Sequence, residues 1–347
     1  MRWGMQGSRN RELTPGAGFR MLEFMATTNV SGSVDLSVQL GPLALKNPTI
    51  TVSGTCGYGD EYAPFMEPAK LGAFTTKSVT LEERKGNAPA RIVETAGGML
   101  NAIGLANVGL KRFITEKLPI ISNLGIPVIV NVAGHTLEEY IQVCERLDAE
   151  PSIAALELNV SCPNVKDGLV FGTDAVALEA LVQQVRQVVK RSYLIVKLSP
   201  NVTDICELAR AAIGGGSDCL SMVNTFVGMA IDVEKRSPIL ANMTGGLSGP
   251  AIKPLALNLV HKVYKDVAGP QNVPIIGMGG VRDWRDAVEF MLAGATAVGI
   301  GTSLFIDPTT PIAVIAGLED YCRRHQVTAL KELIGTLKPG RNEPPAG

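Results

Sequence analysis

The stretch Ala154-Ala-Leu-Glu-Leu-Asn-Val-Ser-Cys-Pro-Asn164 joins a strand-like apolar run to a group of polar side chains. Its first half shows little alternation, which is typical of a parallel strand buried on both faces. Its second half places the thiol of Cys162 between the amides of Asn159 and Asn164. Since most cysteines are inert apolar residues, the interpretation of Cys162 as an acid/base or nucleophilic group depends on its surroundings.

Seven more apolar runs resemble this one, and helical patterns separate most of them. The eight predicted strands are residues 49–52, 73–76, 127–132, 154–160, 193–198, 219–224, 273–278 and 295–300. Amphipathic helices are predicted at residues 137–149, 175–191, 204–214, 253–267, 284–293 and 311–325. Candidate N-caps are Asp174, Thr203 and Asp283. This α/β alternation predicts a (β/α)8 TIM barrel; a doubly wound open sheet is the alternative, although no G-x-G-x-x-G motif follows the first strand.

Several segments depart from this alternation. Residues 1–33 and 338–347 are polar and aperiodic, so both ends are expected to be disordered, while residues 34–337 form the barrel domain. Two connections, residues 78–125 and 225–255, are longer than a barrel needs. Such insertions commonly form active-site lids or partner surfaces.

The composition restricts the classes of function. The chain has 347 residues, of which 46% are hydrophobic and 19% charged, so it can bury a large core. Its formal net charge of −1 gives no electrostatic reason to expect a nucleic acid or an anionic membrane as partner. No apolar run reaches the roughly 20 residues of a membrane helix and no secretory h-region occurs, which favours a cytoplasmic protein. The six cysteines form no C-x-x-C pair, so no metal site is expected.

The ends of the predicted strands carry the polar groups. In a barrel, chemistry gathers at the carboxyl ends of the strands, and six of the eight ends here include Lys, Asn or Ser. A single Asn or Ser there could be only a turn residue. Lys77 and Lys197 are different, because a lysine is poorly placed for burial unless another charge answers it. They predict anionic ligands, such as a substrate carboxylate or a reduced flavin ring; the alternative for Lys197 is a core carboxylate.

Glycines mark the last two strand ends. The motifs are Gly277-Met-Gly-Gly-Val281 and Gly299-Ile-Gly-Thr-Ser303. Glycine lets backbone N–H groups approach an anion, and barrels often hold a phosphate between strands seven and eight. The two motifs therefore predict a cofactor that carries a phosphate group.

Few residues are suited to proton transfer. The chain has three histidines; His261 and His325 fall in predicted helices, and His135 lies near the barrel mouth, where it could simply cap a helix. A Ser/His/Asp triad is therefore poorly supported, and Cys162 is the best candidate near the mouth. A thiol has an ordinary pKa of roughly 8.5, so it needs only modest help to act as a base. The other thiols in helices and strands are expected in the core: Cys144, Cys206, Cys219 and Cys322.

These motifs resemble, in order, those of the class 1 dihydroorotate dehydrogenases, from about Leu36 to Leu337. The shared motifs are Val52-Ser-Gly-Thr55, Thr76-Lys-Ser78, Asn101-Ala-Ile-Gly-Leu105, Val130-Asn-Val-Ala-Gly134, Glu157-Leu-Asn-Val-Ser-Cys-Pro-Asn-Val-Lys166, Val196-Lys-Leu-Ser-Pro-Asn201, Val223-Asn-Thr225, Gly245-Gly-Leu-Ser-Gly-Pro-Ala-Ile-Lys-Pro254 and the two glycine motifs. The resemblance implies an FMN-binding barrel that oxidises dihydroorotate to orotate in pyrimidine biosynthesis. Amides would then satisfy the pyrimidine edges, and lysines the carboxylate and flavin charges.

The resemblance also implies roles for individual residues. Cys162 would remove the C5 proton while a hydride passes from C6 to flavin N5; class 2 relatives have serine at this place. The implied substrate-binding residues are Lys77, Asn101, Ala102, Ile103, Gly104, Leu105, Asn159, Asn224 and Thr225. The implied FMN-binding residues are Ser53, Lys77, Ser78, Asn131, Asn159, Lys197, Val223, Gly249, Gly279, Gly280, Gly301 and Thr302.

The segment 164–174 resembles class 1B, the NAD-linked form. That form implies a partner subunit with FAD and a [2Fe-2S] cluster, and a homodimer within a heterotetramer. This chain has no four-cysteine site and no dinucleotide fingerprint, which fits such a partner but equally fits class 1A, where fumarate takes the electrons. Another FMN barrel that acts on a reduced pyrimidine is a further alternative. Two features depart from the family: the N-terminal extension, and Cys56 as a second thiol near the expected FMN site.

Overall fold

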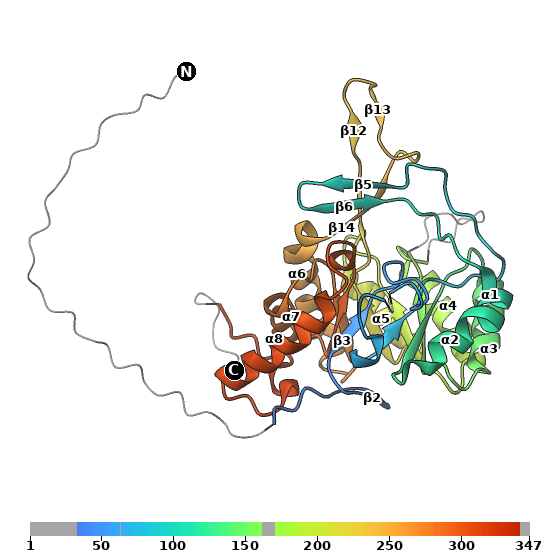
Figure 1. Ribbon diagram of the computed structural model, residues 1–347. Coiled ribbons are helices and arrows are strands. Elements are labelled where there is room, and N and C mark those ends of the chain that lie inside the picture. Colours follow the sequence, from blue (N-terminus) through green and yellow to red (C-terminus); the bar gives the residue numbers. More distant parts are fainter. Residues whose placement is uncertain (1–32, 63, 162–170, 341–347) are drawn as a thin grey trace, which may run out of the picture. The chain divides into compact units, whose positions relative to one another are not determined.

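Eight parallel strands form the centre of the molecule (Figure 1). The computed structural model describes residues 33–62, 64–161 and 171–340. The order of the sheet is β3-β16-β15-β10-β9-β8-β7-β4. Its strands are β3 (Thr49–Thr51), β4 (Phe74–Thr75), β7 (Val128–Val132), β8 (Ala155–Asn159), β9 (Tyr193–Lys197), β10 (Cys219–Met222), β15 (Ile275–Met278) and β16 (Ala297–Ile300). A parallel bridge between Ile50 and Ala73 joins the two ends of this order, so the sheet is a closed (β/α)8 barrel and not an open sheet.

Helices return the chain between the strands and cover the outside of the barrel. The main ones are α3 (Leu137–Asp148), α4 (Ala175–Val188), α5 (Ile205–Gly214), α6 (Lys253–Val263), α7 (Trp284–Leu292) and α8 (Thr310–Arg324). The strands between them are buried on both faces, as their continuous apolar sequences predict. The return from β4 to β7 is broken into short pieces, and no regular helical pattern predicts it. These are α1 (Gly109–Arg112), the π-helical turn η2 (Phe113–Lys117), α2 (Leu118–Ile121) and the 3-10 turn η3 (Ser122–Leu124).

The predicted helix starts are confirmed in two of three cases. Asp174 accepts a hydrogen bond from the N–H of Ala177, and Asp283 caps α7 in the same way. The prediction of Thr203 is wrong. The cap of α5 is Asp204, because its carboxylate accepts from the N–H of Cys206 and so satisfies one of the unpaired donors of the first turn.

The two long connections pair with each other to form a second sheet. Its order is β11-β14-β6-β5, all antiparallel. The strands are β5 (Ile92–Thr95), β6 (Gly98–Asn101), β11 (Phe226–Gly228) and β14 (Gly245–Ser248), and a small hairpin of β12 (Ile231–Asp232) and β13 (Ser237–Pro238) projects beyond them (Figure 1). We call residues 92–101 and 226–248 the cover.

Short elements complete the fold. An antiparallel hairpin of β1 and β2 precedes the barrel. These elements are β1 (Val38–Leu40), β2 (Leu43–Leu45), the 3-10 turns η1 (Pro68–Lys70), η4 (Pro250–Ile252), η6 (Thr302–Phe305) and η7 (Leu330–Leu333), and the π-helical turn η5 (Tyr264–Ala268) that extends α6. The predicted disordered segments, residues 1–33 and 338–347, lie outside the described residues except for residues 33 and 338–340. None of the helices described here has the length and apolar character needed to span a membrane.

Candidate active site

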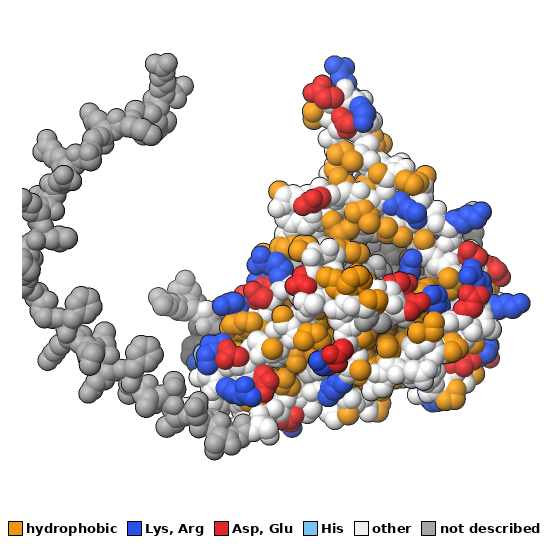
Figure 2. Space-filling view, in the orientation of Figure 1, with side chains coloured by type: hydrophobic (Ala, Val, Ile, Leu, Met, Phe, Trp, Pro, Cys, Tyr) orange, Lys and Arg blue, Asp and Glu red, His pale blue; other side chains and the backbone are white. Residues whose placement is uncertain are grey.

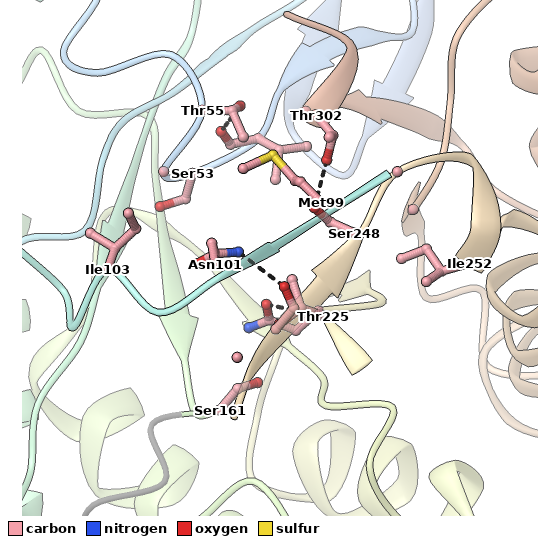
Figure 3. Close-up of a pocket in the computed structure, with 18 of the residues that line it drawn as sticks. Ser53, Thr55, Met99, Asn101, Ile103, Ser161, Thr225, Ser248, Ile252 and Thr302 are labelled. Carbon is pink, nitrogen blue, oxygen red and sulfur yellow. Dashed lines mark hydrogen bonds between the residues drawn. The ribbon is translucent and has the colours of Figure 1, made fainter. Parts of the chain in front are cut away.

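A cavity of about 1640 Å³ lies between the carboxyl ends of the barrel strands and the cover. Figure 3 shows side chains from the barrel, such as Ser53 and Ser161, and from the cover, such as Asn101, around this space. The structure brings nearly all of the sequence-predicted binding residues together here. Those that line the cavity are Ser53, Lys77, Ser78, Asn101, Ala102, Ile103, Gly104, Leu105, Asn159, Lys197, Val223, Asn224, Thr225, Gly249, Gly279, Gly280, Gly301 and Thr302.

The residue predicted to be the base, Cys162, lies outside the described residues, as does Asn164. The chain that leads to it is described. Asn159 at the end of β8, Val160 and Ser161 line the cavity, and Figure 3 shows Ser161 at its edge. The described chain therefore reaches the cavity edge at the residue before Cys162, and the role of this thiol stays a prediction.

Two lysines face the cavity from the barrel. Lys197 is only 4% exposed, and none of the ion pairs within the described ranges involves it. A carboxylate partner for Lys197, the alternative that the sequence left open, is thus not found in this part of the chain. Lys77 is half-buried, and burial lowers its pKa while the negative charge of Glu61 acts in the opposite direction. Since burial of an unpaired ammonium group is costly, both lysines favour an anionic ligand.

A chain of buried hydrogen bonds lies beneath the cavity. Glu157, in the middle of β8, accepts from Asn131 Nδ2 and from Ser221 Oγ, each at 2.6 Å. Asn131 Oδ1 in turn accepts from Ser78 Oγ at 2.5 Å, and Ser78 Oγ lies 3.4 Å from Ser53 Oγ. Asn131, predicted to bind the cofactor, is fully buried behind Ser78 instead of among the cavity-lining residues.

Sequence reasoning did not assign a role to Glu157 or to Ser221. The signal for Glu157 was present, because an acidic residue inside an apolar strand is rarely buried without partners. The sequence gives no comparable signal for Ser221, since a serine in a strand is compatible with many environments. The identity of the partners depends on which side chains point into the barrel, and this follows only from the closed sheet.

Amide side chains are held in one orientation at the side of the cavity formed by the ends of β8 and β10. Asn224 Nδ2 donates to Asn159 Oδ1 at 3.1 Å, while Asn224 Oδ1 accepts from the N–H of Thr225 at 2.9 Å. The amide of Asn159 therefore has its oxygen engaged, which leaves its nitrogen as a donor for a ligand. On the cover, Asn101 Nδ2 lies 3.3 Å from the carbonyl oxygen of Gly246, a weaker contact.

A surface without side chains lies at the ends of β14 and β15. Gly249, Gly279 and Gly280 have φ angles of 99°, 125° and 83°, in the region that favours glycine. A Cβ atom at Gly280 would lie 2.8 Å from the carbonyl oxygen of Gly249, and one at Gly279 would lie 2.9 Å from Ala256 Cβ. Only glycine fits at these positions, so the backbone itself forms a cradle of the kind that holds a phosphate group.

Asn201 joins the barrel to the cover, which the sequence analysis did not anticipate. Its Nδ2 donates to the carbonyl oxygen of Thr225 at 2.9 Å, and its Oδ1 accepts from the N–H of Val227 at 2.9 Å. Thr302 makes a second link, because its hydroxyl donates to Ser248 Oγ at 2.8 Å (Figure 3). The cover is thus attached close to the groups that line the cavity.

The positions of the other thiols and of His135 bear on their predicted roles. Cys56 is buried and does not line the cavity; burial, and then the charge of Glu61, raise its pKa to about 12. His135 lines the cavity, but Thr136 and not His135 caps α3. The four other described thiols are buried, as predicted: Cys144, Cys206, Cys219 and Cys322.

Comparisons with known proteins agree with this geometry. A family model described as dihydroorotate dehydrogenase matches residues 35–321. A protein from Geotalea daltonii is 53% identical over 305 residues, which cover 88% of this chain and 98% of that protein. Relatives from Geotalea uraniireducens and Trichlorobacter lovleyi are 53% and 50% identical, over 88% and 87% of this chain and 99% and 98% of their own lengths. All three are named dihydroorotate dehydrogenase B (NAD(+)), catalytic subunit.

Proposed function

The chain belongs to the dihydroorotate dehydrogenase family, and from this premise we propose that it is the catalytic subunit of an NAD-linked enzyme that oxidises dihydroorotate to orotate in pyrimidine biosynthesis. The observation that carries the proposal is the presence of Lys77 and Lys197 in one cavity, neither in an ion pair with a described residue. A ligand with a carboxylate and a cofactor with anionic groups would supply the missing negative charges.

FMN is the cofactor that these residues fit best. The glycine cradle at Gly249, Gly279 and Gly280 leaves room for a phosphate group against the backbone. Lys197 would place a positive charge beside the cofactor, and the hydroxyls of Ser53 and Ser78 would hydrogen-bond to it. When bound, FMN supplies the acceptor for the hydride that leaves the substrate.

The substrate would lie between the amide groups and the cover. Asn159 and Asn224 offer a donor and an acceptor in a fixed orientation, which suits the alternating N–H and C=O groups of a pyrimidine ring. Lys77 would bind the substrate carboxylate, and residues 101–105 would close over the ring. Cys162 follows the cavity-lining Ser161 in sequence, and we assign to it the removal of the C5 proton.

The electron acceptor is reached through a partner. The relatives are named as catalytic subunits of an NAD(+)-linked enzyme, which favours NAD over fumarate for this chain. We propose a cytoplasmic heterotetramer, built on a homodimer of this chain, in which a second subunit carries FAD and a [2Fe-2S] cluster.

The proposal is tested with purified protein saturated with FMN. Anaerobic addition of dihydroorotate should bleach the flavin absorbance, whereas dihydrouracil should leave it unchanged because it lacks the carboxylate that Lys77 would bind. A protein that cannot be reconstituted with FMN would refute the proposal. A protein that dihydrouracil bleaches in preference would instead be another flavin barrel acting on a reduced pyrimidine.

The role of Cys162 has its own test. Cys162→Ala should retain FMN and orotate binding but slow flavin reduction by roughly two or more decades, the usual scale for loss of a general base. Cys162→Ser should be intermediate, because an alcohol is a much weaker acid than a thiol. Stopped-flow reduction kinetics that are unchanged in Cys162→Ala would contradict the assignment.

A further inference from the structure

Glu157 is the buried acid around which the polar groups beneath the cavity are arranged. Its side chain is 2% exposed and lies in β8, where Glu157 pairs with Asn131 on β7 and with the apolar Ile195 on β9. Its two oxygens accept from different strands: Oε2 from Asn131 on β7, and Oε1 from Ser221 on β10, each at 2.6 Å. A carboxylate in this place costs more desolvation free energy than a neutral side chain, so its presence calls for an explanation beyond packing.

The carboxylate fixes the direction of every hydrogen bond between it and the cavity. Both oxygens of Glu157 accept hydrogen bonds, so Asn131 turns its NH₂ group to Glu157 and its oxygen to Ser78. Ser78 must then donate its single hydroxyl hydrogen to Asn131, over a short distance of 2.5 Å. Toward the cavity, Ser78 Oγ can therefore offer only its lone pairs and act as a hydrogen-bond acceptor.

We propose that Glu157 is a positioning residue that makes the Ser78 hydroxyl a hydrogen-bond acceptor at the flavin site. The inference rests on the proposed function, and it deepens it in one respect: the cofactor group that faces Ser78 is an N–H or O–H donor. We call the hydrogen-bonded series Glu157–Asn131–Ser78 the relay. Asn131 lies behind Ser78 in it, and Glu157 does not touch the ligand.

Glu157→Gln reverses the relay without a change of shape. The buried Ser221 hydroxyl donates to Glu157 and to no other described group, so it should keep the amide oxygen opposite itself; the NH₂ group then stands where Oε2 stood, opposite the NH₂ group of Asn131. The repulsion between these two facing donors is removed when the Asn131 amide rotates by half a turn. Its nitrogen then donates to Ser78. The hydroxyl hydrogen of Ser78 must then turn toward the cavity or toward Ser53 Oγ, 3.4 Å away, and in either case the Ser53–Ser78 pair presents a donor to a cofactor group that also donates. FMN should bind about tenfold more weakly, the effect of roughly one misdirected hydrogen bond, and the visible flavin spectrum should shift.

The decisive variant exchanges acid and amide. Asn131→Asp combined with Glu157→Gln keeps the atom count and the formal charge of the pair, and it restores an acceptor opposite Ser78. The double variant should regain most of the FMN affinity and the wild-type flavin spectrum. Asn131→Asp alone places two carboxylates face to face and should be the weakest binder. A merely structural role for Glu157 predicts no such rescue, because each substitution would then add to the loss.

Two control variants distinguish the effect of hydrogen-bond direction from the effect of losing a buried polar contact. Ser221→Ala removes the other donor to Glu157 but leaves the Asn131 orientation, so FMN affinity should stay within about twofold of wild type, since this hydroxyl is not part of the relay to the cavity. Asp148→Asn alters a carboxylate that accepts from the N–H groups of Lys190 and Ser192, away from the cavity-lining residues. It should lower Tm with no change in the flavin spectrum.

The experiment is a fluorescence titration of each apoprotein with FMN, together with the spectrum of each FMN complex. Restoration in the double variant, relative to Glu157→Gln, supports the inference. FMN affinity of Glu157→Gln equal to wild type, or a double variant that binds no better than Glu157→Gln, overturns it. Failure of the wild-type protein to bind FMN would be a failure of the proposed function, and it is measured first.

Discussion

The floor of the cavity and its cover are built on different principles. We use floor for the barrel strand ends and the side chains behind them, such as Glu157, Asn131 and Lys197, which are almost completely buried. Side-chain hydrogen bonds of 2.5–2.6 Å join the floor, whereas backbone ladders and glycines hold the cover. The cover also exposes large apolar side chains (Figure 2): Ile92, Val227, Met229, Ile231, Val233, Ile239 and Met243.

The difference indicates that the floor and the cover have separate roles in ligand binding. Groups that must present a defined charge or donor direction come from strands that cannot shift without disturbing the core. Groups that must admit and enclose a ligand come from a sheet that is attached at a few places, including Asn201 and Thr302. We therefore expect substitutions in the floor to act on the cofactor and on global stability, and substitutions in the cover to act on the substrate.

A large loss of FMN affinity is expected for Lys197→Met. This change removes the buried ammonium group but keeps an unbranched side chain of similar length. FMN should bind roughly 100-fold more weakly, because charge-assisted hydrogen bonds contribute about 1.5–3 kcal/mol. The apoprotein should have a higher Tm than wild type, since a buried charge without a partner is destabilising. FMN titration and thermal unfolding of the apoprotein measure both quantities. A variant with lower apoprotein Tm and unchanged FMN affinity would mean that Lys197 stabilises the floor itself.

A matched pair of leucines tests whether floor and cover unfold together. Leu156 in β8 is fully buried, and Leu100 in β6 is 2% exposed and packs against Gly228 within the cover. Leu156→Ala should lower the free energy of unfolding of the whole protein by about 2–5 kcal/mol. Leu100→Ala should leave the main unfolding transition almost unchanged. It should weaken orotate binding about tenfold, because Asn101 is the next residue in the chain and depends on this packing for its position. A tenfold loss corresponds to roughly one hydrogen bond. Equal losses of Tm in the two variants would show that the cover belongs to the same cooperative unit.

Much of the floor could be predicted from the sequence. Parallel strands buried on both faces are continuous apolar runs, so all eight were located to within a few residues. Because the carboxyl ends of such strands meet at one edge, polar residues that follow them, such as Ser53 and Lys197, were expected to meet. The strand ends thus carry most of the information about the site.

The cover and the layer behind the cavity could not be predicted in the same way. β6 and β14 are glycine-containing segments that pair across 145 residues of sequence, as in the contact between Asn101 and Gly246, and neither has a strand-like pattern alone. The family resemblance implied that Asn131 binds the cofactor, yet its amide is engaged by Ser78 and Glu157. Which side of a short strand faces the cavity is decided by the closed barrel and not by local sequence.

A smaller effect concerns the pH dependence of the apoprotein. Burial holds the pKa of Lys77 below its usual 10.5, while Glu61 partly offsets this shift. Between the lowered folded pKa and 10.5 the unfolded chain binds more protons than the folded one, so this lysine makes the apoprotein more stable as pH rises through that window. Thermal unfolding of wild type and Lys77→Met should diverge in this direction. The divergence should vanish with a bound carboxylate ligand such as orotate, and a divergence of the opposite sign would show that Lys77 is paired in the folded apoprotein.

The smallest effect is expected when the projecting hairpin is removed. Replacement of residues 231–238 by Asn-Gly leaves Ala230 and Ile239 as a closing pair, since the N–H of Ile239 already donates to the carbonyl oxygen of Ala230 at 3.0 Å. No residue from 229 to 241 is among those that line the cavity, and the tip exposes Ile231 and Val233 at 59% and 75%. The affinities for FMN and orotate should therefore change by less than about twofold, a difference well under 1.4 kcal/mol. A tenfold loss of either affinity would mean that the hairpin supports the cavity from outside. Even the most exposed part of the cover would then contribute to the binding site, and floor and cover could not be treated as separate.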